Sequence, residues 1–154
     1  MAGHPEHQTV FAYLSVDGVP QAMAFYEAVF GARDRGVTLH APDGMIVHAE
    51  MAVGETAFFL AEAAADPGGA AVNLDGPVSM RLAIDVVDVD AAVARAVERG
   101  STVLIEPADQ FYGHRAGRIR DPFGHVWIVS QKLEDVSTAE MQSRLDAMMA
   151  KGSG

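Results

Sequence analysis

Aromatic and ionisable side chains crowd into one short stretch of the sequence. Phe111, Tyr112, His114 and Arg115 surround a glycine just before a predicted hairpin. A glycine-containing loop of this composition beside a hairpin more often lines a site than fills a core. The two rings could stack on the flat part of a small molecule. We therefore expect these four residues to contact a ligand.

His48 and Glu50 are the residues best suited to form an unusual metal site. They lie two residues apart on one face of a predicted strand, a spacing compatible with shared coordination. With His114 or Glu106 they could complete such a site. The simpler alternative is that both side chains are solvated or hydrogen-bonded to neighbours. The chain has no glycine-rich phosphate loop and no Gly-x-Ser-x-Gly motif, so we assign no catalytic residue.

The composition limits the classes of partner. The chain of 154 residues suits one domain or two small fused modules, and its net charge of −10 disfavours nucleic acid and anionic membranes. It has no cysteine, which excludes disulfides and zinc–sulfur sites. No apolar run approaches the roughly 20 residues that span a bilayer, and residues 1–8 lack a signal-peptide core. We therefore expect a cytoplasmic protein.

Hydrophobic periodicity predicts a strand over residues 10–16, then a helix and three more strands. Asp17 can cap the helix, and Gly31 ends it. The buried stripe of the helix is spaced at i, i+3, i+4, i+7 and i+8 and contains Ala22, Phe25, Tyr26, Val29 and Phe30. The three strands cover residues 34–40, 45–53 and 56–62. Residues 64–77, which contain several alanines, glycines and prolines, form a linker.

The same pattern restarts after the linker. Residues 78–86 predict a strand, and a helix begins near Asp88 and ends at Gly100. Gly100 follows Gly31 by 69 residues, which indicates internal duplication of a βαβββ module. The second half closes with a strand over residues 117–120, a turn at Asp121-Pro122-Phe123-Gly124 and a strand over residues 125–131. Alternation in the last strand predicts one row of side chains facing a concave sheet and the other row packing under the helices.

A further helix is predicted near residues 137–150. Ser137 and Glu140 have the spacing of a capping box. The apolar stripe of this helix contains Met141, Leu145, Met148 and Met149. These flexible side chains could pack on the domain or on a second subunit.

The motif DPFGHVW, preceded by DQFYGHRAGRIR, resembles the second half of vicinal-oxygen-chelate proteins. That superfamily includes glyoxalases, bleomycin-resistance proteins and extradiol dioxygenases, and the PhnB-like branch is the most similar. The runs YLSVDGVPQAMAFYEAVFGA and IDVVDVDAAVARAVERGSTV resemble its two strand–helix segments, so the resemblance covers most of the chain. It implies an α+β fold in which two tandem βαβββ modules form a cupped, barrel-like mixed sheet, followed by a C-terminal helix. It also implies a homodimer.

The expected boundaries follow from this reading. The first module, with a short N-terminal lead, occupies residues 1–63, and the linker occupies residues 64–77. The second module occupies residues 78–131, and the C-terminal helix and tail occupy residues 132–154.

The resemblance also locates four positions at which metal-dependent members place their ligands. These positions fall on Phe11, near Phe59, on Arg81 and on Ile128, and Glu62 is an alternative at the second. Divalent cations need oxygen or imidazole donors, which Phe and Ile lack, and a guanidinium repels a cation. We therefore expect no metal at this site and no other cofactor.

A cup lined in this way would be an apolar pocket suited to a small molecule. The resemblance implies a metal-free small-molecule binding protein that could sequester a drug or another planar metabolite. Arg81 would pair with an internal carboxylate, such as Glu50 or Asp85, or with an acidic group of the ligand. The expected ligand-binding residues are Phe11, Tyr13, Phe59, Arg81, Phe111, Tyr112, His114, Arg115 and Ile128. Two alternatives stay open: a metal-dependent lyase, isomerase or dioxygenase with a non-standard site, and a dimeric module whose pocket is vestigial.

Overall fold

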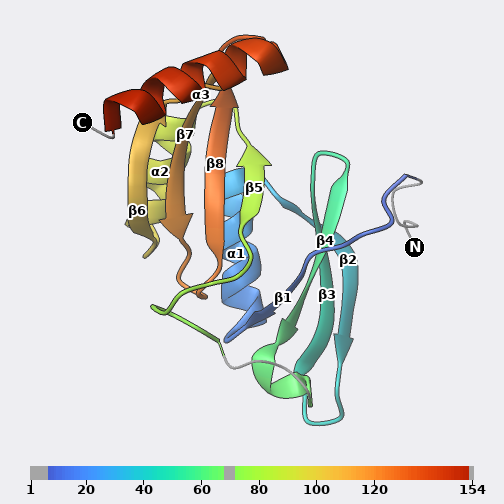
Figure 1. The fold of residues 1–154 in the computed structure, drawn as a ribbon. Helices are drawn as coiled ribbons and strands as arrows, with labels where there is room; N and C mark the ends of the chain where they lie inside the picture. Colours follow the sequence, from blue (N-terminus) through green and yellow to red (C-terminus); the bar gives the residue numbers. More distant parts are fainter. Residues whose placement is uncertain (1–6, 68–71, 153–154) are drawn as a thin grey trace.

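A computed structural model describes residues 7–67 and 72–152 of the chain (Figure 1). Two βαβββ modules follow one another, as predicted. The first contains β1 (Tyr13–Val16), α1 (Val19–Phe30), β2 (Arg33–His40), β3 (Ile46–Val53) and β4 (Thr56–Glu62). The second contains β5 (Leu82–Asp85), α2 (Val89–Glu98), β6 (Thr102–Asp109), β7 (His114–Arg120) and β8 (Val126–Lys132). A short 3-10 helix, η1 (Ala63–Ala65), follows β4, and helix α3 (Thr138–Gly152) lies at the C-terminal end.

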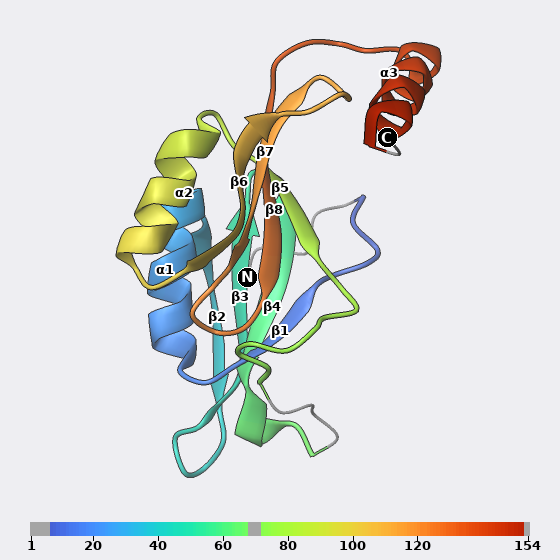
Figure 2. The ribbon, with the colours of Figure 1, turned by 60° about the vertical axis from the view of Figure 1, so that its left-hand side comes forward.

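Each module forms its own four-stranded mixed sheet. The strand orders are β1-β4-β3-β2 and β5-β8-β7-β6, so the two sheets have the same topology. In each, the first strand runs parallel to the last, and the other neighbours are antiparallel. Figure 2 shows α1 and α2 on the same side of the molecule, where they contact each other. The cupped α+β fold expected from the sequence is therefore confirmed, with the two sheets not closed into one barrel.

A side chain from the last strand of each module caps the start of that module's helix. The carboxylate of Glu62 accepts hydrogen bonds from the N–H groups of Gly18 and Val19, at 2.9 and 2.7 Å. Gln131 Oε1 accepts a hydrogen bond from the N–H of Val89 at 3.0 Å. Both side chains satisfy donors that the first turn of a helix leaves unpaired. The two capping residues are 69 residues apart in the sequence, the same interval that separates Gly31 from Gly100.

One hydrophobic core joins the two modules. The hydroxyl of Tyr26 on α1 donates a hydrogen bond to Asp121 Oδ2 at 2.5 Å, and the indole of Trp127 donates to the same oxygen at 2.9 Å. Asp121 Oδ1 accepts from the N–H groups of Phe123 and His125, at 2.9 and 3.0 Å, which closes the predicted turn. Burial, followed by the charge of Asp121, raises the pKa of Tyr26 well above its ordinary value. A protonated Tyr26 thus ties the first module to the second.

The first strand is shorter than predicted. Regular pairing with β4 begins at Tyr13, not at the start of the predicted run. The side chain of Gln8 accepts from the N–H of Ala57 at 2.8 Å and donates to its carbonyl at 2.7 Å. The side chain of Gln8 therefore satisfies the N–H and carbonyl groups of Ala57, which would otherwise be free to pair with a longer first strand. The predicted helix cap is also wrong, because Gly18, not Asp17, is the N-cap of α1.

The strands of the second module differ from prediction at two places. The strand predicted over residues 78–86 is confined to β5, whose pairing with β8 begins at Leu82. The strand predicted over residues 117–120 extends back to His114. His114 and Arg115 therefore belong to β7 and not to a loop, since they pair with Lys132 and Gln131.

Helix α3 stands apart from the sheets. Figure 2 shows it beyond the ends of β7 and β8, reached by an extended segment, and none of its residues is buried. Arg144 holds it through hydrogen bonds to the carbonyl of Phe111 at 3.2 Å and to Glu134 at 2.8 Å. Met148 and Met149 are exposed. No helix in the described part of the chain combines the length and apolar character that crossing a membrane requires.

Candidate ligand-binding site

One face of the first sheet carries aromatic and ionisable side chains. The opposite face sends Leu14, Met51 and Leu60 into the core. Phe59 pairs with Tyr13 on one side and with Glu50 on the other, so these three side chains share the face that points away from the helices. We define the first-sheet face as Phe11, Tyr13, His48, Glu50 and Phe59.

The aromatic rings of this face form a continuous surface. The rings of Phe11 and Phe59 are stacked, with centroids 4.9 Å apart and an interplanar angle of 12°. Tyr13 meets Phe59 edge-on at 5.6 Å, and the His48 ring lies 5.0 Å from Phe59. Half of Tyr13 is exposed, so the surface is accessible from outside.

A chain of polar contacts runs from Tyr13 into the sheet. Its hydroxyl lies 2.7 Å from His48 Nδ1, and His48 Nε2 lies 2.9 Å from Glu50 Oε2. The Glu50 carboxylate can only accept, so Nε2 donates to it. The Tyr13 hydroxyl, which also lies 3.3 Å from the carbonyl oxygen of Val47, donates to Nδ1 in the tautomer that leaves Nδ1 unprotonated. The guanidinium of Arg35 lies 3.3 Å from the other oxygen of Glu50. The contacts thus join an exposed phenol to a carboxylate that is 6% exposed.

The protonation of Tyr13 follows from these surroundings. Burial, then the negative charges of Asp66 and Glu50, raise the pKa of the Tyr13 hydroxyl above its ordinary value. The hydroxyl is therefore protonated at neutral pH. The hydroxyl can donate a hydrogen bond to His48 while its oxygen accepts a hydrogen bond from a ligand.

The possible metal ligands of the first sheet are engaged by other groups of the protein. Both ring nitrogens of His48 and both oxygens of Glu50 already have protein partners. Glu62, the open alternative for one ligand position, caps α1 on the helix side of the sheet. Within residues 7–67 and 72–152, no three His, Asp or Glu side chains are grouped closely enough to bind a metal.

The second sheet also has a face that points away from the helices. Trp127 and Val129 enter the core, whereas Ile128 pairs with Arg118 on one side and Ala83 on the other. The predicted alternation of this strand is therefore confirmed. A cavity of about 610 Å³ on this face is lined by residues of the linker end, β6, β7 and β8, including Val126 and three arginines, Arg81, Arg118 and Arg120. We define the second-sheet face as Arg81, Arg118, Arg120, Val126 and Ile128.

Three predicted ligand residues gather at the other end of the second sheet, near α3. The rings of Phe111 and Tyr112 meet edge-on at 5.2 Å, and Tyr112 lies 5.5 Å from the ring of His114. His114 Nδ1 is 2.8 Å from the hydroxyl of Ser130 on β8. These side chains are half-buried rather than fully exposed.

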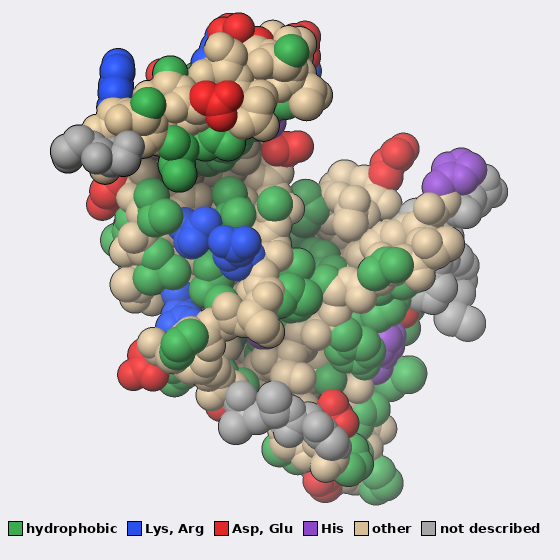
Figure 3. Space-filling view, in the orientation of Figure 1, with side chains coloured by type: hydrophobic (Ala, Val, Ile, Leu, Met, Phe, Trp, Pro, Cys, Tyr) green, Lys and Arg blue, Asp and Glu red, His purple; other side chains and the backbone are tan. Residues whose placement is uncertain are grey.

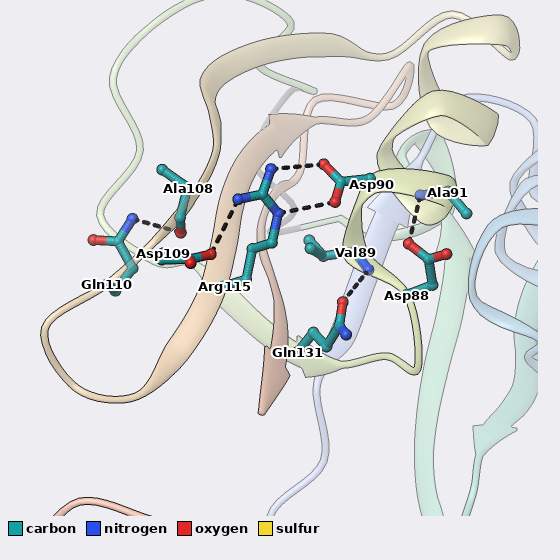
Figure 4. A network of polar contacts seen from close by, with 9 residues as sticks. All are labelled: Asp88, Val89, Asp90, Ala91, Ala108, Asp109, Gln110, Arg115 and Gln131. Atoms are coloured by element: carbon teal, nitrogen blue, oxygen red, sulfur yellow. Dashed lines mark hydrogen bonds and ion pairs between the residues drawn. The ribbon is translucent and has the colours of Figure 1, made fainter. Parts of the chain in front are cut away.

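Arg115 has a different location from the other predicted residues. Figure 4 shows its guanidinium between Asp90 at the start of α2 and Asp109 on β6. It donates to Asp90 at 2.8 and 3.0 Å and to Asp109 at 3.1 Å. Hydrogen bonds to these two carboxylates raise the pKa of Arg115 above its ordinary value. Its pairing with Gln131, the cap of α2, puts it on the helix side of β7.

The predicted residues therefore fall into separate groups. Phe11, Tyr13 and Phe59 lie together on the first sheet, Arg81 and Ile128 on the second, and Arg115 under α2. A cavity of about 470 Å³ where the sheets meet is lined by residues such as Val10, Leu82 and Ile84 and by none of the predicted set. Arg118 and Arg120 were missed, although their alternation along one strand was the signal that could have found them.

The sequence matches a model of the Glyoxalase/Bleomycin resistance protein/Dioxygenase superfamily over residues 6–129. It is 35% identical over 147 residues to an uncharacterized protein of Mycobacterium bovis, a match that covers 92% of this chain and 93% of that protein. Among solved structures, it resembles a PhnB protein from Bacillus cereus with a TM-score of 0.64 and 16% identity, covering 80% of this chain and 99% of the other. A glyoxalase family protein from Bacillus cereus gives a TM-score of 0.67 with 17% identity, covering 87% and 99%. At these identities the two structures support the fold alone.

Proposed function

The chain belongs to the glyoxalase/bleomycin resistance protein/dioxygenase superfamily, and we propose that it binds a planar small molecule without a metal ion. The stacked pair Phe11 and Phe59, with half-exposed Tyr13 beside it, is the observation that carries this proposal. Two of these rings stand where metal-dependent relatives are expected to place ligands. The role that fits such a surface is sequestration of a drug or another planar metabolite.

A planar ligand would gain free energy from this surface in two ways. Apolar area removed from water contributes about 25 cal/mol per Å². Offset or edge-to-face contact with a ring adds about 0.5–1.5 kcal/mol. The Tyr13 hydroxyl, held at 2.7 Å by His48, would fix the orientation of a polar group on the ligand.

The second sheet would supply the rest of the site. In this proposal Ile128 and Arg81 contact the ligand, whereas Phe111, Tyr112 and His114, at the other end of the sheet near α3, do not. Arg115 is left out, because two carboxylates already hold its guanidinium on the helix side of β7.

We also propose that the protein is a cytoplasmic homodimer. The support for a dimer is α3, a helix of 15 residues of which none is buried and whose last turns expose Met148 and Met149. An amphipathic helix normally buries its apolar stripe against another surface. A second copy of the chain would provide that surface.

A second candidate function is an isomerase or lyase of the same superfamily. The Tyr13–His48–Glu50 contacts favour it, because they have the order nucleophile or acid, imidazole, carboxylate found in acid–base sites. In the proposed step, a carbon acid beside a carbonyl gives its proton to Tyr13 while Tyr13 passes its own proton to His48. The product is a carbanion, or enolate, and an imidazolium paired with Glu50. Return of the proton to a different carbon would complete an isomerisation.

A ligand screen tests the binding proposal. Saturation-transfer NMR against fused aromatic compounds should detect binding, and Phe59→Ala should weaken it several-fold because one stacking partner is lost. Val87→Ala, at a residue that is 94% exposed outside both faces, is the control and should bind like the natural chain. Absence of binding at millimolar concentration, or equal affinity in Phe59→Ala, would reject the proposal.

A deuterium-exchange assay tests the second candidate. With a bound planar ketone in D₂O, the natural chain should exchange the hydrogen next to the carbonyl, and Tyr13→Phe should bind the ketone without exchanging it. Exchange that persists in Tyr13→Phe would exclude this tyrosine as the proton-transfer group.

A further inference from the structure

Three arginines converge on one side of the second sheet. Arg120 pairs with Val126, and Arg118 pairs with Ile128, so the two guanidinium side chains leave β7 on the same face, roughly 7 Å apart along the strand. Arg81 comes one residue before the pair formed by Leu82 and Trp127, which sets it beside Val126. Figure 3 shows Lys and Arg side chains gathered over this sheet with hydrophobic side chains around them.

These arginines lack the carboxylate partners that Arg115 and Arg144 have. Arg115 contacts two carboxylates, and so does Arg144. Within the described ranges, no ion pair joins Arg81, Arg118 or Arg120 to a carboxylate. The chain has 21 acidic and 11 basic residues, so unpaired cations are not a result of too few carboxylates.

Two buried donors on this face have no acceptor. Nε of Arg118 and Nε of Arg120 are buried and make no hydrogen bond in the described structure. Arg120 is only 8% exposed, and its other contact is a hydrogen bond to the carbonyl of Gly76. A buried guanidinium donor without an acceptor costs free energy, and an anion in the adjacent cavity would remove that cost.

The cavity itself fits an anionic group with an apolar remainder. It has a volume of about 610 Å³ and is bounded by residues 75–79, the three arginines, Leu104 and Val126. The one acidic residue of its lining, Asp75, is exposed and forms no ion pair with the arginines in the described structure. Apolar Val126, with Ile128 next along the strand, provides a surface for the organic part of a ligand.

We propose that Arg81, Arg118 and Arg120 bind a tetrahedral oxyanion, a phosphate or phosphonate group carried by the small-molecule ligand. Three guanidinium groups offer more forked donors than the two oxygens of one carboxylate can accept, whereas a phosphate monoester has three terminal oxygens and about two negative charges. This inference names the polar group of the proposed ligand and rests on the proposed function.

Calorimetry with phenyl phosphate, inorganic phosphate and benzoate tests the inference. At low salt, phenyl phosphate should bind most tightly, inorganic phosphate less tightly and benzoate least. Arg118→Met should weaken phenyl phosphate about tenfold or more, the loss expected for charge-assisted hydrogen bonds. Arg99→Met, which removes the same charge at the end of α2, should change affinity less than twofold. Raising the salt concentration should weaken binding in the natural chain.

Different outcomes separate this inference from the proposed function. Equal affinity for benzoate and phenyl phosphate, or unchanged affinity in both Arg118→Met and Arg81→Met, would overturn the oxyanion site. Neutral fused aromatics that bind in a Phe59-dependent manner would then still support the planar-ligand proposal. Arginine-dependent binding of inorganic phosphate with no binding of aromatics would support the oxyanion site and reject the planar ligand. A thermal melt of each variant confirms that it is folded.

Discussion

The hydroxyl of Tyr13 and Nδ1 of His48 lie 2.7 Å apart, and this contact joins an accessible aromatic surface to the buried carboxylate of Glu50. The residues at the two ends of the Tyr13–His48–Glu50 series differ in exposure: Tyr13 is 50% exposed, and Glu50 is 6% exposed. The face therefore combines rings that can hold a planar ligand with a proton donor and acceptor at its edge.

The difference in exposure predicts unequal effects of two substitutions. His48→Ala removes a partner from a buried carboxylate and should lower the free energy of unfolding by about 1–3 kcal/mol. Tyr13→Phe removes a hydroxyl that water can replace, so its loss should be much smaller. Urea denaturation of both variants measures the two losses in the free energy of unfolding. Equal losses would contradict the claim that His48 stabilises the buried carboxylate of Glu50.

The Tyr26–Asp121 hydrogen bond predicts a dependence of stability on alkaline pH. The pKa of Tyr26 is raised in the folded chain, so folding holds its proton more tightly than the unfolded chain does. Its contribution is complete below the ordinary tyrosine pKa of about 10 and is lost as pH rises through the higher folded value. Tyr26→Phe should be less stable at neutral pH by about 1–3 kcal/mol, because Asp121 loses a donor. The variant should also lose less stability between pH 9 and 11 than the natural chain. If the free energy of unfolding falls equally with pH in both chains, the pKa of Tyr26 is not raised by folding.

Arg81→Met should leave the unliganded protein folded and as stable as the natural chain. Arg81 is exposed, and neither Glu50 nor Asp85 forms an ion pair with it in the described structure. The substitution should therefore act on anion binding alone. Thermal unfolding and phenyl phosphate affinity of this variant measure the two effects separately. A large fall in melting temperature with unchanged affinity would mean that Arg81 has an internal structural role.

Deletion of residues 137–154 should convert a dimer into a monomer. The exposed methionines of α3 would no longer cover a second subunit, whereas the core, which contains no residue of α3, stays intact. Light scattering at micromolar concentration should give twice the chain mass of 16.3 kDa for the natural protein and a single, smaller chain mass for the deletion. A monomeric full-length protein would refute the dimer.

The sequence predicted the features that depend on local spacing. The helix stripes, the turn at Asp121 and the duplication marked by Gly31 and Gly100 are all set by residues close in the chain. Alternation along β8 also predicted correctly that Trp127 enters the core and Ile128 does not.

Features that depend on distant partners could not be predicted in the same way. The side chain of Gln8 hydrogen-bonds to the backbone of Ala57 where a strand residue was expected to pair. No residue close to Gln8 in the sequence indicates this contact. Arg115 was grouped with its aromatic neighbours, but pairing across β7 turns it toward Asp90. Arg118 and Arg120 were overlooked although both lie in the predicted strand over residues 117–120, because the alternation of side chains along that short strand was not followed.

Native mass spectrometry of protein purified without added metal tests the central claim most directly. The account predicts chains that carry no stoichiometric divalent metal and a bound organic molecule that dissociates on collisional activation. The positions Phe11, Phe59, Arg81 and Ile128 supply no donor for a metal, and the nitrogens and oxygens of His48 and Glu50 are engaged by protein. About one transition metal per chain, lost when residues around position 81 are substituted, would contradict the account.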